Sequence, residues 1–176
     1  IPGTVGGGVC MNAGAYGGEI SQVLESVRAL LPTGEIAFLT REEMEMSYRH
    51  TKLMDLGAVA LEATFALEPG SREEIAARMA DYNRRRREKQ PLKLPSAGSF
   101  FKRPEGYFAG KLIQDAGLKG ARVGGAQISE MHAGFLVNLG DATAKDVLDL
   151  MALVQRTVYE KFGVRLEPEV RILGED

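Results

Sequence analysis

The sequence has little cysteine, histidine and tryptophan. Its 176 residues include one cysteine (Cys10), two histidines (His50 and His132) and no tryptophan. A single cysteine excludes a disulfide within the chain and is typical of a reducing compartment, so we expect a cytoplasmic protein. One thiol and two separated imidazoles are too few for a metal cage, so we predict no metal site.

A strong net charge and a long apolar run are also lacking. The chain has 22 basic and 24 acidic residues, a formal net charge of −2. This balance argues against general electrostatic binding to nucleic acid or to a membrane surface. No apolar run approaches the roughly 20 residues of a membrane-spanning helix. Hydrophobic residues make up 44% of the chain, enough for a buried core.

Glycine, by contrast, is abundant, above all in the opening IPGTVGGGVCMNAGAYGG. Glycine is used where φ must be positive or where another group approaches the backbone closely. The residues therefore leave two interpretations open. One is a run of tight turns between strands, and the other is a ligand that lies against the main chain.

The remaining pattern predicts a mixture of strands and helices. Strands are expected at residues 27–31, 36–39, 58–67 and 132–140, with a strand pair or one kinked strand at 164–173. Helices are expected from a Ser71/Glu74 capping box through the arginines at 84–87, over 107–116 before Gly117, and from Thr143 to Gly163. Strands and helices do not alternate regularly, which favours an α+β fold.

The basic run at residues 84–87 is the one feature that suits a small nucleic-acid-binding module. Only Tyr82 among its neighbours is aromatic, and the surroundings are not basic. Cations also suit the negative end of a helix dipole. We therefore favour a solvent-exposed helix end and predict no nucleic-acid partner.

Three polar residues are candidates for chemistry. Ser99 lies in PSAGSFFKRP and could be an acid, a nucleophile or a turn former. A hydrolase is disfavoured because the G-x-S-x-G pattern is absent and neither histidine has an evident partner. Glu169 lies on an otherwise apolar segment, where a carboxylate is either exposed or functional. Arg49, in SYRHT, could hold a carboxylate or pair with one on the surface.

Taken together, the motifs become more specific. IPGTVGGGVCMNAGAYG, SYRHT, KLPSAGSFFKRP, GLKGARVGGAQISEMHAGFLVN and LEPEVRILG follow one another along residues 1–174. In this order the chain resembles the UDP-N-acetylenolpyruvoylglucosamine reductase (MurB) family. The resemblance implies a cytoplasmic flavoprotein oxidoreductase of peptidoglycan synthesis, and hence of cell wall biogenesis, cell shape and cell division. It would use FAD and NADPH to reduce UDP-N-acetylglucosamine enolpyruvate to UDP-N-acetylmuramate.

The same resemblance implies an arrangement of domains. Residues 1–68 would be the C-terminal part of a vanillyl-alcohol-oxidase-type FAD-binding domain. Residues 69–176 would be an α+β substrate-binding domain that ends in a catalytic strand. FAD would lie against the glycine-rich opening, at Pro2, Gly3, Thr4, Gly6, Gly7, Asn12, Ala13, Gly14, Tyr16 and Gly17.

The resemblance also assigns roles to the three polar candidates. Flavin would give a hydride to the enolpyruvyl β-carbon, and Ser99 would give a proton to the α-carbon. Arg49 would neutralise the charge that develops on the substrate carboxylate. Glu169 would act near the same carboxylate if it is protonated or orients a donor.

Five further residues would bind the substrate by resemblance. Lys89 and Lys119 match basic contacts, and Tyr107 matches a family tyrosine although its spacing differs. Arg103 and His132 stand where some members have asparagine and glutamine. Residues 67–90 have no room for a tyrosine-bearing loop, which indicates the subclass that lacks this loop.

The family's N-terminal segment, with a loop that grips the FAD pyrophosphate, would precede Ile1. We therefore expect the chain to be part of a longer enzyme, with that segment as its partner. The alternative is a catalytically silent chain that binds the UDP-sugar but cannot hold FAD.

Overall fold

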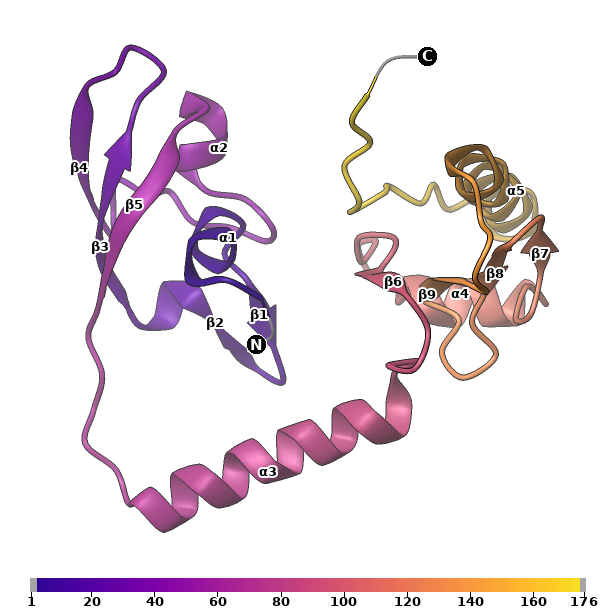
Figure 1. The fold of residues 1–176 in the computed structure, drawn as a ribbon, viewed down its shortest axis with the longest axis horizontal. Coiled ribbons are helices and arrows are strands. Elements are labelled where there is room, and N and C mark those ends of the chain that lie inside the picture. The colour runs from indigo at the N-terminus through magenta and orange to yellow at the C-terminus, as the bar shows by residue number, and fades with distance from the viewer. Residues whose placement is uncertain (1–2, 175–176) are drawn as a thin grey trace. The chain divides into compact units, whose positions relative to one another are not determined.

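The computed structural model describes residues 3–174. The chain divides into two units, Ile1–Ala77 and Arg78–Asp176, which are described here one at a time (Figure 1). Both contain helices and antiparallel strands, which confirms the predicted α+β class. No helix among residues 3–174 is long and apolar enough to cross a membrane.

The first unit is built on a three-stranded antiparallel sheet with the order β4-β3-β5. Strands β3 (Leu24–Leu30) and β4 (Ile36–Thr40) form the predicted hairpin, and β5 (Val59–Phe65) confirms the third predicted strand. One face of β3 is buried in a small core. The buried apolar residues of this core are Val9, Leu24, Val27, Ala29, Met44 and Leu53.

Several short elements of this unit were not predicted. They are α1 (Val5–Cys10), β1 (Gly14–Ala15), β2 (Gly18–Glu19), the 3₁₀ turn η1 (Ile20–Gln22) and α2 (Lys52–Leu56). Helix α1 lies inside the glycine-rich opening, where each glycine costs helix stability of about 1 kcal/mol relative to alanine. Burial of Val9 and the cap formed by Thr4, whose hydroxyl accepts from the Gly7 N–H at 3.2 Å, compensate for this cost.

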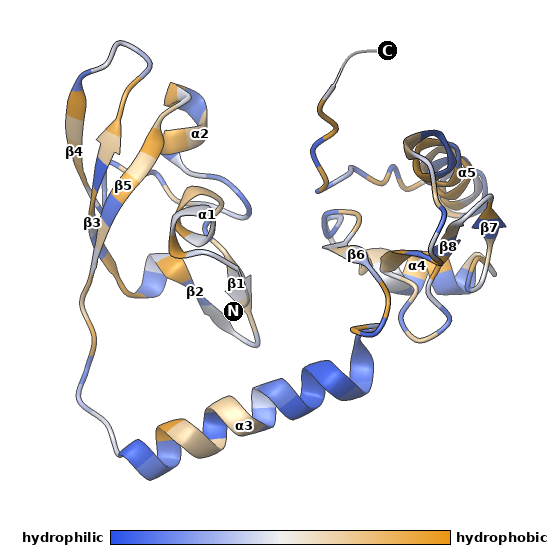
Figure 2. Ribbon diagram, viewed as in Figure 1, coloured by the Kyte–Doolittle hydropathy of each residue, from blue (hydrophilic) through white to orange (hydrophobic). Residues whose placement is uncertain are grey.

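Helix α3 (Arg72–Lys89) confirms the helix predicted from the capping pattern. The Ser71 hydroxyl accepts a hydrogen bond from the Glu74 N–H at 3.4 Å. None of its residues is buried, and Figure 2 shows that its second half is hydrophilic. Arg84 pairs with Asp81 and Glu88 on the same helix. The basic run is thus partly neutralised within its own helix.

The second unit contains a four-stranded antiparallel sheet with the order β6-β9-β8-β7. Its elements are β6 (Ser96–Ser99), α4 (Ala109–Asp115), β7 (Arg122–Val123), β8 (Ala126–Ile128), β9 (Phe135–Asn138) and α5 (Ala144–Phe162). Ala126, Ile128 and Leu136 share a core with the buried residues of α4 and α5, such as Ile113 and Leu150. Alternate residues of a strand point to opposite faces, so Gln127 and Val137 face away from this core.

The strand predicted at residues 164–173, expected to be the catalytic strand, does not form. The segment makes one isolated bridge, between Phe101 and Pro168. Backbone hydrogen bonds flank this bridge, from the Lys102 N–H to the Glu167 carbonyl (2.8 Å) and from the Glu169 N–H to the Phe100 carbonyl (2.9 Å). Pro168 has no N–H to donate, so the ladder is interrupted where the pattern predicted a strand.

Helix α5 begins and ends as predicted. Thr143 and Asp146 form a capping box, and Gly163 ends the helix with φ 68°. The Asp146 carboxylate also accepts from the Gly125 N–H at 3.4 Å, so the cap ties the helix to the β7–β8 turn. Backbone and hydroxyl hydrogen bonds from Thr143 lower the pKa of Asp146 below its ordinary 3.8.

Gly125 is required for space, and replacing it with alanine should destabilise the second unit. A Cβ at this position would overlap the backbone nitrogen of Ala142, which has little freedom to move. We expect Gly125→Ala to lower the free energy of unfolding by about 1–3 kcal/mol, as overpacking does. Urea unfolding measures this, with Gly18→Ala as the control because its Cβ would meet nothing nearer than 3.8 Å. Equal stability of the two variants would contradict the prediction.

The Asp146 cap should make stability depend on pH. Its pKa is lowered in the folded chain, so the stabilisation is fully present above the unfolded value of 3.8 and is lost as pH falls through the lower folded value. Asp146→Asn should therefore cost stability at pH 7 and progressively less below about pH 4. Thermal unfolding of both proteins at pH 7 and pH 3 measures this. A destabilisation that is the same at both pH values would contradict it.

Candidate active site

Backbone hydrogen bonds of Phe100 connect the segments that carry two of the three predicted catalytic residues. Ser99 ends β6 opposite Phe135, and the next N–H, that of Phe100, donates to the Gly134 carbonyl at 2.9 Å. The Phe100 carbonyl in turn accepts from the N–H of Glu169 at 2.9 Å. Phe100 itself is only 4% exposed. The second unit thus fixes the backbone of Glu169 against Phe100, the residue that follows Ser99.

His132 borders the same position. Its Nδ1 accepts a hydrogen bond from the Gly134 N–H at 3.0 Å, and its ring packs edge-on against Phe135 at 5.1 Å. A Cβ on Gly134 would lie 3.0 Å from the imidazole Cε1 and 3.6 Å from the Ser99 Oγ. A side chain on Gly134 would therefore crowd the imidazole, whereas its distance to the Ser99 hydroxyl would be that of an ordinary contact. Because Nδ1 is the acceptor, the neutral ring carries its proton on Nε2.

The surroundings of His132 favour its neutral form. Burial lowers the pKa of the imidazole below 6.5, and the positive charge of Lys119 lowers this pKa further. Lys119 was predicted as a basic substrate contact, and this interaction places its charge within reach of His132. The site therefore offers a fixed neutral donor beside a cation at pH 7.

Arg103 and Tyr107 are also brought together. The Arg103 Nε donates to the Tyr107 carbonyl at 3.2 Å, and its guanidinium carbon lies 4.0 Å from the centre of the Phe108 ring. Phe108 was not predicted as a site residue, because the helix was expected to begin at residue 107, whereas α4 begins at Ala109 and leaves Phe108 directly before it. Lys89, the last residue of α3, is exposed.

Arg49, the third predicted catalytic residue, belongs to the first unit. It has φ 57° in a tight turn closed by backbone hydrogen bonds between Ser47 and His50. Its guanidinium carbon lies 5.0 Å from the centre of the Tyr48 ring. The Asn12 side chain donates to the Ser47 carbonyl at 3.1 Å, which ties this turn to the glycine-rich opening.

The predicted cofactor residues differ in how far they are exposed. Asn12 and Ala13 are buried, and the Asn12 amide is engaged with Ser47 and with the Ser21 N–H, so its side chain has a structural role. Gly14 lies half-buried in the β1–β2 ribbon. The exposed or half-buried backbone is at Gly3, Thr4, Gly6, Gly7, Tyr16 and Gly17, and Pro2 lies outside the described residues.

The exposed group fits a flat cofactor. No atom of the described chain lies within 4 Å of a Cβ built on Gly3, Gly6 or Gly17. Packing within the chain therefore does not account for the bare backbone at Gly6, which needs no positive φ. Such a surface suits a flavin that rests against main chain.

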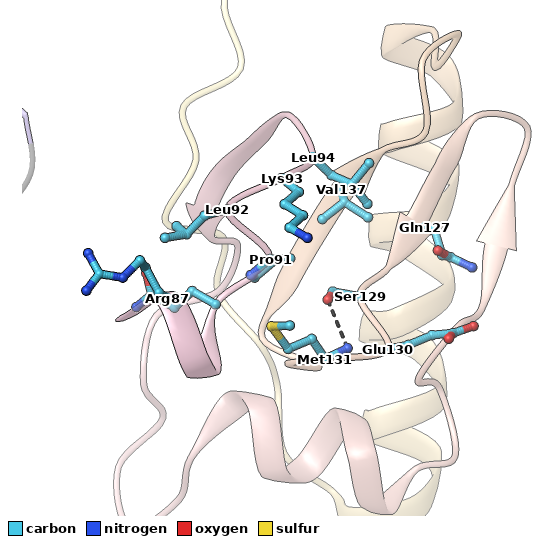
Figure 3. A pocket seen from close by; sticks show the side chains of 11 residues that line it. Arg87, Pro91, Leu92, Lys93, Leu94, Gln127, Ser129, Glu130, Met131 and Val137 are labelled. Atoms are coloured by element: carbon cyan, nitrogen blue, oxygen red, sulfur yellow. Dashed lines mark hydrogen bonds between the residues drawn. The ribbon is translucent and has the colours of Figure 1, made fainter. Parts of the chain in front are cut away.

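A pocket of about 560 Å³ lies on the face of the second sheet opposite to α4 and α5, and sequence reasoning missed it (Figure 3). Its walls are mainly apolar, with Arg87 and Lys93 as cations. Its remaining lining residues are Gln90, Pro91, Leu92, Leu94, Gln127, Ser129, Glu130, Met131 and Val137. The Ser129 hydroxyl accepts from the N–H groups of Met131 and His132, so one turn shapes both the pocket and the histidine. The missed signal is the polar Gln127 between buried Ala126 and Ile128.

No three potential metal ligands lie close together within residues 3–174.

Comparison with known proteins identifies the family. Residues 90–173 match the family described as UDP-N-acetylenolpyruvoylglucosamine reductase, C-terminal domain. Proteins named UDP-N-acetylenolpyruvoylglucosamine reductase from Alkaliphilus oremlandii and Lachnoclostridium phytofermentans are each 59% identical to it, over 100% and 99% of this chain. The chain belongs to the MurB family.

A solved MurB structure supports this membership at the level of the fold. The crystal structure of the Thermus caldophilus UDP-N-acetylenolpyruvylglucosamine reductase (MurB) matches with a TM-score of 0.81 and 43% identity. The match covers 96% of this chain and 60% of that one. The chain also spans only 58% and 56% of the two MurB relatives named above.

The environment of His132 in this MurB chain predicts a low titration midpoint. NMR titration of the imidazole should give a midpoint below 6.5, because burial and Lys119 both disfavour the charged ring. Lys119→Met removes the positive charge and should raise the midpoint, while Lys145→Met on α5 serves as the control. A midpoint above 6.5, or one that does not change with Lys119→Met, would contradict this account.

Proposed function

We propose that this chain carries the substrate-binding and proton-donating part of a cytoplasmic enzyme of peptidoglycan synthesis. The enzyme uses FAD and NADPH to reduce UDP-N-acetylglucosamine enolpyruvate to UDP-N-acetylmuramate. The observation that carries the proposal is the pair of Phe100 hydrogen bonds that join the segment of Glu169 and the segment of Gly134 to the residue after Ser99, in a chain of the MurB family.

Ser99 is the proposed proton donor. When bound, the flavin supplies a hydride to the β-carbon of the enolpyruvyl group. The Ser99 hydroxyl then delivers the proton to the α-carbon. It is exposed at the end of β6, and its backbone is fixed by the pairing with Phe135 and by the adjacent hydrogen bond from Phe100 to Gly134.

The substrate carboxylate gains charge during this reaction and needs groups that meet that charge. Glu169 is half-buried and its backbone is bonded to Phe100, the residue after Ser99. A protonated carboxyl or an oriented donor would serve there. Arg49 is the proposed cation, and its assignment rests on the SYRHT motif. Its turn has a defined shape, because Ser47 and His50 close it and Asn12 anchors it.

Substrate binding is assigned to cations and neutral donors of the second unit. Lys89, Arg103 and Lys119 would meet the diphosphate, and His132 and Tyr107 would add neutral donors. The pocket of about 560 Å³ offers apolar walls that suit a flat ring, with Arg87 and Lys93 as cations and Glu130 as a carboxylate at its edge.

The cofactor is assigned to the first unit. Residues 1–68 would form part of a vanillyl-alcohol-oxidase-type FAD-binding domain, with the exposed glycine backbone against the flavin. The second candidate function is that of a catalytically silent chain that binds the UDP-sugar but not FAD. We retain this alternative because the chain spans only 58% of the length of a MurB relative.

Ser99→Ala tests the proton donor. We expect kcat to fall by at least about 100-fold, the usual contribution of a positioned acid, while substrate affinity changes little. Steady-state turnover with NADPH and the enolpyruvyl substrate measures this. Ser96→Ala is the matched control, because the Ser96 hydroxyl donates to the Leu136 carbonyl at 2.9 Å and has a structural role. Full turnover by Ser99→Ala would overturn the assignment.

The visible spectrum after incubation with FAD and desalting separates the two functions. A retained and shifted flavin band supports the reductase. A colourless protein that still binds the UDP-sugar supports the silent alternative.

A further inference from the structure

Phe108 is a large apolar side chain with no place in the core. It is 61% exposed and lies directly before α4. As the helix N-cap it forms no capping hydrogen bond with its side chain. Neither capping nor burial therefore accounts for an aromatic ring at this position.

The ring packs against Arg103 instead. The guanidinium carbon of Arg103 lies 4.0 Å from the centre of the Phe108 ring. In the comparable pair, the guanidinium carbon of Arg165 lies 5.3 Å from the ring centre of Tyr159, a residue of α5. The Nε of Arg103 also donates to the Tyr107 carbonyl, the residue before Phe108. The two contacts hold the guanidinium at two points, its carbon over the ring and its Nε at the Tyr107 carbonyl.

The backbone that carries the Phe108 ring is fixed by hydrogen bonds. The Phe108 carbonyl accepts from the N–H groups of Lys111 and Leu112 at 3.0 Å each, so Phe108 begins the first turn of α4. Leu112 and Ile113 anchor that helix in the core of the second unit. The position of the ring is therefore set by buried packing, although the ring is exposed.

We propose that Phe108 is a positioning residue, which holds the Arg103 guanidinium in the orientation that binds the diphosphate of the substrate. This inference rests on the proposed function, in which Arg103 contacts the substrate. A guanidinium binds phosphate oxygens through paired N–H groups, so its orientation matters. An arginine that is already ordered loses less conformational freedom on binding, and affinity rises accordingly.

The test is Phe108→Leu in the full-length enzyme, with UDP-N-acetylglucosamine enolpyruvate as the probe. We expect Kd and KM to rise about three-fold, the effect of losing one exposed cation–π contact, while kcat changes less than about two-fold. Phe108→Tyr keeps an aromatic face and should restore the wild-type affinity. Tyr159→Leu removes the comparable contact with Arg165 and should leave Kd unchanged.

An Arg103→Ala background separates positioning from direct contact. There, Phe108→Leu should cause no further loss of affinity. A further loss would show that the ring itself contacts the substrate, which overturns the proposal. Unchanged affinity in the single variant also overturns it, as does a fall in kcat and melting temperature without a change in Kd.

The wild-type enzyme distinguishes this proposal from the proposed function. If the wild type does not bind the UDP-sugar, the proposed function fails and this inference fails with it. If the wild type binds and turns over but Phe108→Leu behaves identically, only the role of Phe108 fails.

Discussion

The backbone of Phe100 is the constraint on which the candidate site of the second unit depends. Its N–H and carbonyl bind Gly134, directly before β9, and Glu169, while its side chain is buried in the core. A single backbone hydrogen bond contributes about 1 kcal/mol net, but a buried group left without a partner costs about 1–3 kcal/mol. Residues 164–173 form no strand, and the bond from Glu169 to Phe100 fixes the backbone of this segment together with the bonds that Glu167 and Leu166 accept.

Close approach to Gly134 is the second requirement of the site. The imidazole of His132 and the hydroxyl of Ser99 both border the space that a Cβ would fill. The N–H of the same glycine orients the imidazole, and Lys119 helps to keep that imidazole neutral. One residue without a side chain thus sets the position and the hydrogen-bonding state of its neighbours.

The two units present different kinds of surface. The opening of the first unit has bare backbone, with Asn12 used internally to fix the turn that carries Arg49. The second unit has charged and aromatic side chains on a framework of sheet and two helices. Helix α3, with its paired arginines and no buried residue, shows why a run of basic residues does not by itself indicate a nucleic-acid site.

The sequence by itself determined the β3–β4 hairpin, the starts of α3 and α5 and the α+β class, because capping residues, turns and apolar periodicity act locally. It also contained the motifs of the MurB family. Only the tertiary structure decided that the backbone of Glu169 is bonded to that of Phe100 without a strand, that Arg103 rests on Phe108, and that Gln127 faces a pocket. The first depends on a contact between residues far apart in sequence, and the third on which face of a strand is covered. Arg103 and Phe108 are close in sequence, but their contact depends on α4 beginning directly after Phe108, where its buried residues pack.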